Sequence, residues 1–291
     1  MSNQAANTKI KSQSAFMLSM RRLVKNKSAM AGISIALILA VLAIFAPYII
    51  PYNYAEVNPA IACQGPSAEH WFGTDDLGRD IFSRIIYGGR YSLRLGIMTV
   101  GVSLFFGLII GSVAGYFGGW VDNIIMRLLD IQHAIPGMLL SIVVAAVLGT
   151  GFNNTVIALA IGGIAGYTRI LRAQIMAIRQ KEYLEAADAI NCSTFRIITR
   201  HILPNTLSPL IVNATMQCAT TLLAAAALSY IGLGVQPPEP EWGAMLSGAR
   251  DYIRHYPYML VFPGVFIMIV VVSLNMFGDG LRDALDPKLK K

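Results

Sequence analysis

The chain has 291 residues, of which 55% are hydrophobic and 13% are charged, and its mean hydropathy is +0.56. This composition excludes an ordinary soluble domain and predicts an all-α polytopic membrane protein with about six transmembrane helices. The net charge of +7 does not indicate nucleic-acid binding, because the basic residues are distributed as membrane topology requires.

The N-terminal segment, residues 1–28, contains six Lys or Arg residues and no acidic residue. The apolar stretch 29–50 follows, carries no charge and is long enough to span a bilayer. It is too long for a signal peptide, and no small-x-small cleavage site precedes Pro47. We therefore expect an uncleaved anchor helix, followed by an extracytoplasmic segment at 51–94.

Three acidic residues, Asp75, Asp76 and Asp80, lie close together in this outer segment. An EF-hand calcium loop needs alternating acids before a glycine and a glutamate at its twelfth position, and the spacing here does not match. Arg79 and Arg84 are near enough in the sequence to pair with the acids. We expect a folded, charge-neutral connection, with docking of a binding protein as the alternative.

Residues 95–280 are expected to form a core of five further helices. Three of these helices are apolar stretches free of charge, at 95–117, 207–233 and 257–277. The other two signals are weaker, because 128–148 contains Asp130 and 156–171 is short. The sequence GTGFNN at 149–154 has the glycine and asparagine content of a tight turn between them.

The basic residues decide the orientation, since short cytoplasmic connections collect Lys and Arg. If the N-terminus lies inside, the inner segments hold 17 of the 23 basic residues and the outer segments hold six. We therefore expect both termini to be cytoplasmic, including the tail at 281–291.

Few polar side chains fall within the predicted spans. Asp130 follows Arg127 by three residues and is expected to pair with it near the cytoplasmic surface. His133 lies one turn further on, where it either packs between helices or lines a solute path. Asn213 and Gln217 lie one turn apart in the fifth span, and their amides either face the solute path or bond neighbouring helices.

Small residues repeat at intervals of four in two spans, namely Gly107, Gly111 and Gly115 in one and Gly162 and Gly166 in the other. Such faces let helix backbones approach closely, either within this subunit or at a subunit interface. Pro136 and Pro263 lie inside predicted spans, where a missing amide hydrogen bond permits a kink.

No catalytic or metal site is expected. The chain has no phosphate-binding G-x-x-x-x-G-K-[ST] loop, so energy from ATP has to come from another subunit. The three cysteines and four histidines are scattered, without the spacing of a disulfide framework or a metal site. The charge-free spans also lack the nucleophile and base of an intramembrane hydrolase.

The inner loop at 173–205 is too long for a simple connection and is patterned as two short helices. The first contains Glu185, Ala186 and Ala187 and is expected to end at Asn191, because asparagine tolerates the left-handed conformation. Two such helices fit a groove on another protein, with the alanines allowing close approach and Glu185 pairing with a basic residue. The alternative is a solvated loop folded onto its own bundle.

Ser193 is expected to cap the second short helix, which Pro204 ends. Phe195, Ile198 and Ile202 fall at positions i, i+3 and i+7 of that helix and so predict an apolar stripe.

This loop resembles the EAA loop of ATP-binding cassette importer permeases. The resemblance rests on Glu185-Ala186-Ala187, a turn residue four positions later and the Leu203-Pro204 ending. The family has glycine where this chain has Asn191, and a hydrophobic residue where it has His201. The resemblance implies that the following residues couple the permease to an ATPase: Glu185, Ala186, Ala187, Asn191, Phe195, Ile198 and Pro204.

Four longer strings resemble the C-type permease of dipeptide, oligopeptide and nickel importers. They are GTDDLGRDIFSRIIYGGRYSL (73–93), GYFGGWVDNIIMRLLD (115–130), RHILPNTLSPLIV (200–212) and IGLGVQPPEPEWGAML (231–246). The resemblance extends from about Ala29 to Pro287. It implies a type I ABC importer permease fold in the cytoplasmic (inner) membrane of a bacterium.

The same resemblance implies partners and a solute. The chain is expected to form half of a translocation pathway with a second homologous permease, two ABC ATPase subunits and an extracytoplasmic solute-binding protein. ATP and Mg would belong to the ATPases, and this chain would hold no cofactor. The expected solute is a di- or oligopeptide, with nickel chelates, glutathione or another small solute as alternatives. An ion-coupled secondary transporter and an embedded enzyme are the alternatives from other classes.

Overall fold

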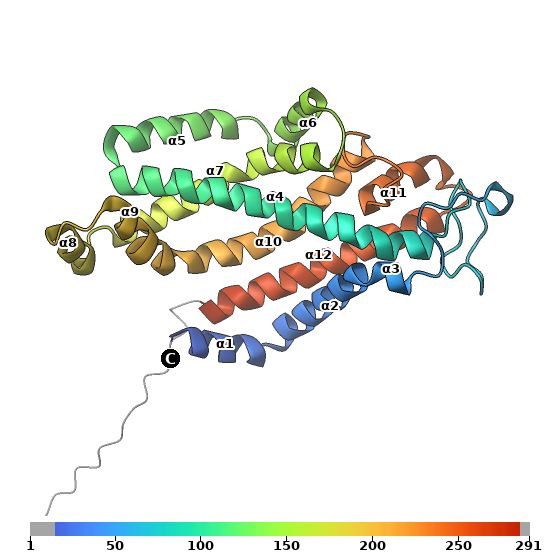
Figure 1. The fold of residues 1–291 in the computed structure, drawn as a ribbon, viewed down its shortest axis with the longest axis horizontal. Coiled ribbons are helices and arrows are strands. Elements are labelled where there is room, and N and C mark those ends of the chain that lie inside the picture. Colours follow the sequence, from blue (N-terminus) through green and yellow to red (C-terminus); the bar gives the residue numbers. More distant parts are fainter. Residues whose placement is uncertain (1–14, 286–291) are drawn as a thin grey trace, which may run out of the picture.

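The computed structural model describes residues 15–285, which form an all-helical bundle (Figure 1). Within these residues five helices are long and apolar enough to cross a membrane, and there are six spans if one bent pair of helices counts as a single span. The expectation of about six spans is confirmed. The spans are α2 Lys27–Ile44, α4 Ile81–Phe117, α5 Gly119–His133 with α6 Gly137–Leu148, α7 Phe152–Ile178, α10 Leu203–Tyr230 and α12 Tyr258–Leu285.

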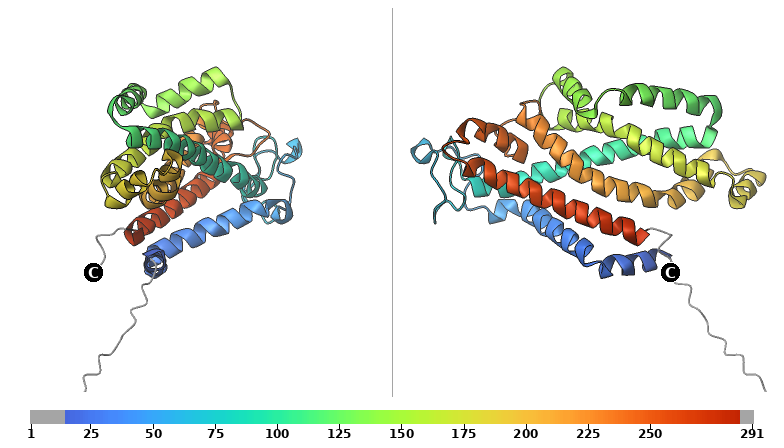
Figure 2. Two further views of the ribbon diagram at one scale, coloured as in Figure 1. Left: turned by 60° about the vertical axis from the view of Figure 1, so that its left-hand side comes forward. Right: turned by 180° about the vertical axis from the view of Figure 1, so that it is seen from behind.

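Shorter helices lie at the two ends of this bundle. They are α1 Ala15–Lys25, α3 Ala46–Ile49, α8 Glu182–Ala189, α9 Thr194–Arg196 and α11 Trp242–Ala249. Figures 1 and 2 place α8 and α9 at one end, and the connection 51–80 together with α11 at the other. The C-terminal end of α12 points toward the end that carries α8, as α1 does.

The bundle centres on the packing of α4 against α7. An added Cβ at Gly111 would lie 2.9 Å from the Thr168 carbonyl oxygen, and one at Gly115 would lie 2.8 Å from the Cβ of Ile175. Gly107 likewise faces Tyr167. This row of glycines therefore packs within the subunit, which confirms one of the two expected roles.

The third span is broken rather than kinked. α5 and α6 meet at an angle of 86°, and Pro136 precedes the first residue of α6 instead of lying inside a continuous helix. Asp130 pairs with Arg169 of α7 at 2.9 Å, so the predicted pair with Arg127 is wrong. The reason is that α5 lies beside α7, whose cation is closer to the carboxylate than the one on its own helix.

The second span begins earlier than its apolar run. Asp80 caps α4 by accepting a hydrogen bond from the Ser83 amide, so the helix starts at Ile81 and continues for 37 residues. A helix of that length is about 55 Å long, whereas the hydrocarbon core is about 30 Å thick. The first turns of α4 can therefore stand outside the membrane, as the prediction for 51–94 requires.

Candidate coupling site

α8 lies across the end of the bundle and is anchored to it by one face. Leu184 and Ala187 are 7% and 6% exposed. They pack with Ile197 and Ile202 in a core that also contains Ile175 of α7. The first half of the inner loop is therefore fixed to its own chain through these two side chains.

The turn after α8 has the geometry that the sequence predicts. Asn191 has a φ of 56°, in the left-handed region. The Cys192 amide donates to the Ala187 carbonyl at 3.1 Å, a 6→1 bond that closes a Schellman-type helix end. The expectation that Asn191 ends the helix is confirmed, and glycine is the residue that this position accepts most easily.

The second half of the loop is not a separate short helix. α9 continues through a π-helical turn at Ile197–Ile202 into α10. The whole stretch Thr194–Tyr230 is long and apolar enough to be one membrane-spanning helix. Pro204 lies in the first turn of α10, where a missing N–H is tolerated, so the prediction that it ends a helix is wrong. Ser193 precedes α9, but its side chain makes no capping hydrogen bond.

The predicted apolar stripe is also wrong. Phe195 is 78% exposed, Ile198 is partly buried, and Ile202 is 1% exposed. The π-helical turn adds one residue to the helical repeat, so Ile197 and Ile202, five positions apart, face the core together.

The outward side of the loop exposes large apolar and aromatic side chains. Ile190 and Phe195 are 76% and 78% exposed, and Tyr183 is 40% exposed. Glu185 and Ala186 are exposed beside them on α8. We call these five residues the coupling surface, and Figure 1 shows α8 projecting beyond the end of α4.

A hollow of about 240 Å³ lies next to this surface. Glu185 and Arg179 line it together with the aromatic side chains Tyr116 and Phe117 from the end of α4. A carboxylate and a guanidinium at the rim of an aromatic hollow can receive both a polar and an apolar side chain.

The three candidate residues for the solute path do not form a single site. Asn213 lines a cavity of about 410 Å³ with Ser208, Met216 and Arg282. Gln217 follows one turn later and is partly buried. Within residues 15–285 neither amide side chain forms a hydrogen bond to a neighbouring helix. His133 is exposed at the end of α5 and does not line this cavity.

The structure also shows a polar contact that sequence reasoning missed. The Gln132 amide donates to the Ile161 carbonyl of α7 at 2.6 Å. Together with Asp130 and Arg169, this bond holds the loosely packed α5 against α7. The signal that could have revealed it is an uncharged amide beside two polar residues within a predicted span.

Comparison with known proteins identifies the family. A model described as binding-protein-dependent transport system inner membrane component matches residues 107–291. The model of the N-terminal TM domain of oligopeptide transport permease C matches residues 14–66. The chain belongs to this family of transport permeases. The resemblance to C-type permeases of peptide importers is thereby confirmed.

Two relatives cover nearly the whole permease. The dipeptide transport system permease protein DppC of Alkalihalophilus pseudofirmus is 50% identical over 270 residues, which are 93% of this chain and 89% of the relative. The glutathione transport system permease protein GsiD of Pectobacterium atrosepticum is 44% identical over 273 residues, 93% of this chain and 90% of the relative.

Solved structures confirm the fold. An amino acid ABC transporter matches with a TM-score of 0.52 at 16% identity, over 68% of this chain and 92% of that chain. The MetNI methionine ABC transporter in an inward-facing conformation matches with a TM-score of 0.50 at 21% identity, over 67% of this chain and 94% of that chain. The permease therefore has the ABC importer fold.

Proposed function

We propose that this permease forms half of the translocation pathway of an ATP-driven importer and that its coupling surface receives an ATPase subunit. One observation carries the proposal: Ile190 and Phe195 are each more than three-quarters exposed on the loop that joins α7 to α10. Burying an apolar side chain of this size in a protein groove contributes about 1.5–3 kcal/mol. Helices that carry such anchors are a common mode of docking.

The loop connects this surface to two spans. Its first half packs on α7 through Leu184 and Ala187, and its second half continues into α10 without a break. A partner that pulls on the coupling surface therefore displaces α7 and α10 together. Such a displacement supports alternation between inward-open and outward-open states.

The partners follow from the family. We propose a second homologous permease, two ABC ATPases that hold ATP and Mg, and an extracytoplasmic solute-binding protein. The segments 1–28, 173–205 and 281–291 would be cytoplasmic, and 51–94 would be extracytoplasmic, in the inner membrane of a bacterium. The structure supports this orientation by placing α1, α8 and the end of α12 toward one end of the bundle.

We propose a di- or oligopeptide as the solute, since the relative with 50% identity carries dipeptide transport in its name. Glutathione is the second candidate because of the relative with 44% identity. Nickel chelates remain an alternative, although no group of three His, Cys, Asp or Glu residues that could hold a metal occurs in 15–285. An ion-coupled carrier is disfavoured, because Asp122 and Asp130 are both paired with arginines of α7.

Copurification tests the docking. Phe195→Asp and Ile190→Asp place a carboxylate on the coupling surface, and each is expected to reduce recovery of the ATPases with the solubilised permease at least tenfold. Gly65→Asp is the matched control, because it adds the same charge at an exposed site at the opposite end of the bundle. Full recovery of ATPases with both loop variants would contradict the proposal.

Reconstitution tests the solute and the energy source. The complex in liposomes should take up a dipeptide only with ATP inside and with the binding protein outside. Uptake by this chain alone under an ion gradient would contradict the importer assignment. Stimulation of ATP hydrolysis by binding protein loaded with glutathione or a nickel chelate, but not with dipeptide, would change the solute and leave the coupling role intact.

A further inference from the structure

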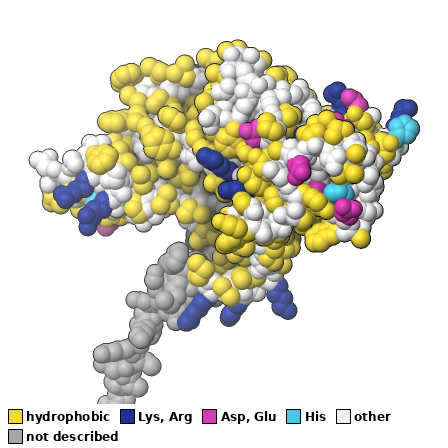
Figure 3. Space-filling view, turned by 45° about the vertical axis from the view of Figure 1, so that its right-hand side comes forward, with side chains coloured by type: hydrophobic (Ala, Val, Ile, Leu, Met, Phe, Trp, Pro, Cys, Tyr) yellow, Lys and Arg dark blue, Asp and Glu magenta, His cyan; other side chains and the backbone are white. Residues whose placement is uncertain are grey.

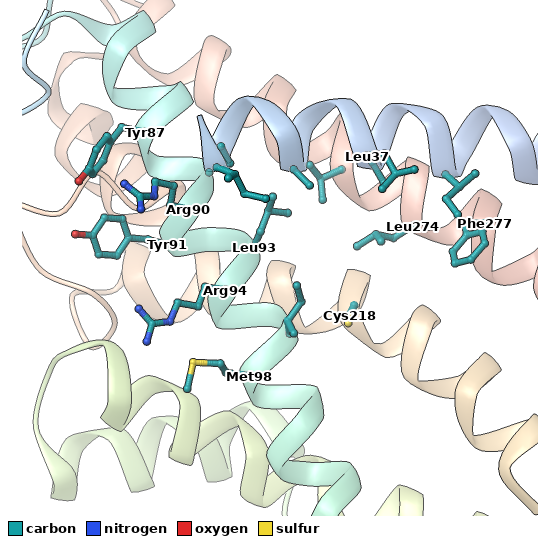
Figure 4. A pocket seen from close by; sticks show the side chains of 18 residues that line it. Leu37, Tyr87, Arg90, Tyr91, Leu93, Arg94, Met98, Cys218, Leu274 and Phe277 are labelled. Atoms are coloured by element: carbon teal, nitrogen blue, oxygen red, sulfur yellow. The ribbon is translucent and has the colours of Figure 1, made fainter. Parts of the chain in front are cut away.

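A groove of about 680 Å³ lies between α2 and α4, and residues of α10 and α12 complete its lining (Figure 4). Its walls are apolar along most of their length and include Ala36, Leu37, Leu93, Leu274 and Phe277. Two of its lining residues, Leu37 and Ile97, are 57% and 66% exposed. The groove is therefore open to its surroundings and lined for an apolar occupant.

Two cations lie at one end of this groove. Arg90 and Arg94 are exposed, lie one turn apart on α4, and form no ion pair with any residue from 15 to 285. The Arg90 guanidinium lies 5.2 Å from the centre of the Tyr87 ring, and that of Arg94 lies 5.3 Å from the centre of the Phe152 ring. These ring contacts hold both charges in place without neutralising them.

The cations mark a membrane boundary. Arg94 is the last charged residue before the uncharged stretch 95–117, and Tyr54 stacks on Tyr87 at 4.0 Å nearby. Tyrosines gather at the membrane–water interface. Figure 4 shows Arg90 and Arg94 beside the tyrosines, with Leu274 and Phe277 at the far end of the groove.

The length of the groove matches one leaflet. Its wall on α2 extends from Ile33 to Ile44, a rise of about 17 Å at 1.5 Å per residue. The hydrocarbon of a single leaflet is about 15 Å thick, half of the bilayer core. An added Cβ at Gly89 would lie 3.2 Å from the Cβ of Ala43, so the outer end of this wall lies level with Arg90. An acyl chain that enters beside Arg90 would therefore follow the wall toward the bilayer midplane.

We propose that this groove binds an anionic phospholipid from the leaflet on the side of the 51–80 connection. Its phosphate lies between Arg90 and Arg94, and one acyl chain lies along α2 and α4. A peptide solute does not match, because its amides would lose their hydrogen bonds against apolar walls. A helix from another subunit would bury two guanidinium charges unless it brought acids to pair with them. The lipid bridges α2 and α4 and so fixes the anchor helix to the core.

Photolabelling of the importer complex, purified with its copurifying subunits in nanodiscs, tests this assignment. The probe is phosphatidylglycerol with a diazirine halfway along one acyl chain. Illumination is expected to label residues 33–44 of α2 and 93–98 of α4. Arg90→Gln combined with Arg94→Gln is expected to weaken binding roughly thirtyfold. Arg254→Gln, which removes an exposed cation outside the groove, should leave the labelling unchanged.

A second variant keeps both cations and fills the groove. Ala40→Trp is expected to reduce labelling by the anionic probe while leaving Arg90 and Arg94 in place. Equal labelling by a phosphatidylcholine probe, whose head group has no net charge, would overturn the assignment. Labelling of the isolated chain but not of the complex would overturn it too, because another subunit would then fill the groove. The readout does not depend on transport, so it is independent of the proposed function.

Discussion

Residues 51–80 and the loop 182–205 are both polar connections, and they lie at opposite ends of the bundle (Figures 1 and 2). In the first, the charged groups with little exposure are paired within the chain. Asp75 pairs with Arg79 at 2.7 Å and with Arg84 at 3.5 Å, and Asp80 pairs with the His70 ring at 3.0 Å. Figure 3 shows acidic and histidine side chains gathered at this end.

The loop 182–205 is built in the opposite way. It anchors itself with a few apolar contacts and leaves Ile190 and Phe195 exposed. A connection whose charged groups are paired internally can hold its shape alone. Large apolar side chains exposed close together mark a protein interaction surface. Trp71 of the first connection is also 59% exposed, but its ring packs against Phe82 of the same chain. The difference supports the proposal that the loop 182–205 receives an ATPase subunit.

The largest effect is expected from substitutions in the coupling surface of the loop 182–205. Ala186→Asp and Glu185→Lys change exposed residues of the coupling surface, so we expect normal membrane insertion and a complete loss of transport. Membrane fractionation and ATP hydrolysis by the assembled complex measure the two properties. Normal stimulation of hydrolysis by loaded binding protein in both variants would argue against the coupling role.

Ala187→Asp is the informative contrast to Ala186→Asp. Ala187 is 6% exposed and faces the core, so an unpaired carboxylate there is expected to destabilise the loop itself by about 3 kcal/mol or more. Limited proteolysis within 182–205 should be fast in Ala187→Asp and unchanged in Ala186→Asp. Equal proteolysis of the two would show that the inward and outward faces are assigned wrongly.

The next largest effect is expected from removing an internal ion pair in the connection 51–80. Asp80 is 3% exposed, caps α4 at the Ser83 amide at 2.7 Å and bonds His70. Asp80→Ala leaves both partners without an acceptor and is expected to cost about 2–4 kcal/mol of local stability. Hydrogen exchange over residues 51–85 measures it. Asp80→Asn keeps an oxygen for the cap, so it should lose less than half as much local stability as Asp80→Ala. An equal loss of stability in the two variants would show that the negative charge of Asp80, rather than the cap, is responsible.

The pH dependence of the segment before α11 gives a smaller effect. Glu241 is 2% exposed, accepts hydrogen bonds from Ser92 and the Ala244 amide, and burial raises the pKa of its carboxyl above 4.5. The folded segment thus binds a proton more tightly than the unfolded one. Its stability is highest below pH 4.5 and declines as the pH rises through the raised pKa.

Glu241→Gln should remove this dependence while keeping an acceptor oxygen. Urea unfolding at pH 5 and pH 8 compares the variant with the parent chain, both with Trp71 and Trp120 replaced by Phe so that the fluorescence reports Trp242. A pH dependence of equal size in both proteins would show that another group is responsible.

The smallest effect is expected from substitutions of Asn191, which test the geometry of the turn after α8. Asn191 has a φ of 56°, so Asn191→Gly should be neutral or slightly stabilising. Asn191→Ala places a residue with a Cβ and no compensating side-chain bond in the left-handed region, at a cost of about 1 kcal/mol. Proteolysis rates of the loop measure both. A loop that tolerates alanine as well as glycine would contradict this account of the turn.

Four of the spans could be predicted with ease because their apolar runs are long and free of charge, and the turn at Asn191 could be predicted because asparagine suits a left-handed conformation. The 86° break between α5 and α6 could not be predicted, although Pro136 marks its place. Its angle depends on α5 lying against α7 through Asp130 and Gln132, which are contacts between distant parts of the sequence.

The coupling site was only partly predictable for a similar reason. Periodicity assumes 3.6 residues per turn, and the π-helical turn at Ile197–Ile202 shifts the inward face by one residue. The stripe of Phe195, Ile198 and Ile202 is therefore split between surface and core. The triplet at 185–187 is split as well, with Ala187 inside and its two neighbours outside. Which side of a short helix faces water is decided by what it packs against.

The most direct test of the central claim is a photo-crosslink from the coupling surface. Benzoylphenylalanine is placed at Phe195 in the intact complex. The control carries the same group at Tyr48, which is 87% exposed on α3 at the opposite end of the bundle. The account predicts a covalent adduct between this chain and the ATP-hydrolysing subunit from position 195 and none from position 48. Illumination at position 195 that yields no adduct with a nucleotide-hydrolysing subunit, with and without ATP, would contradict it.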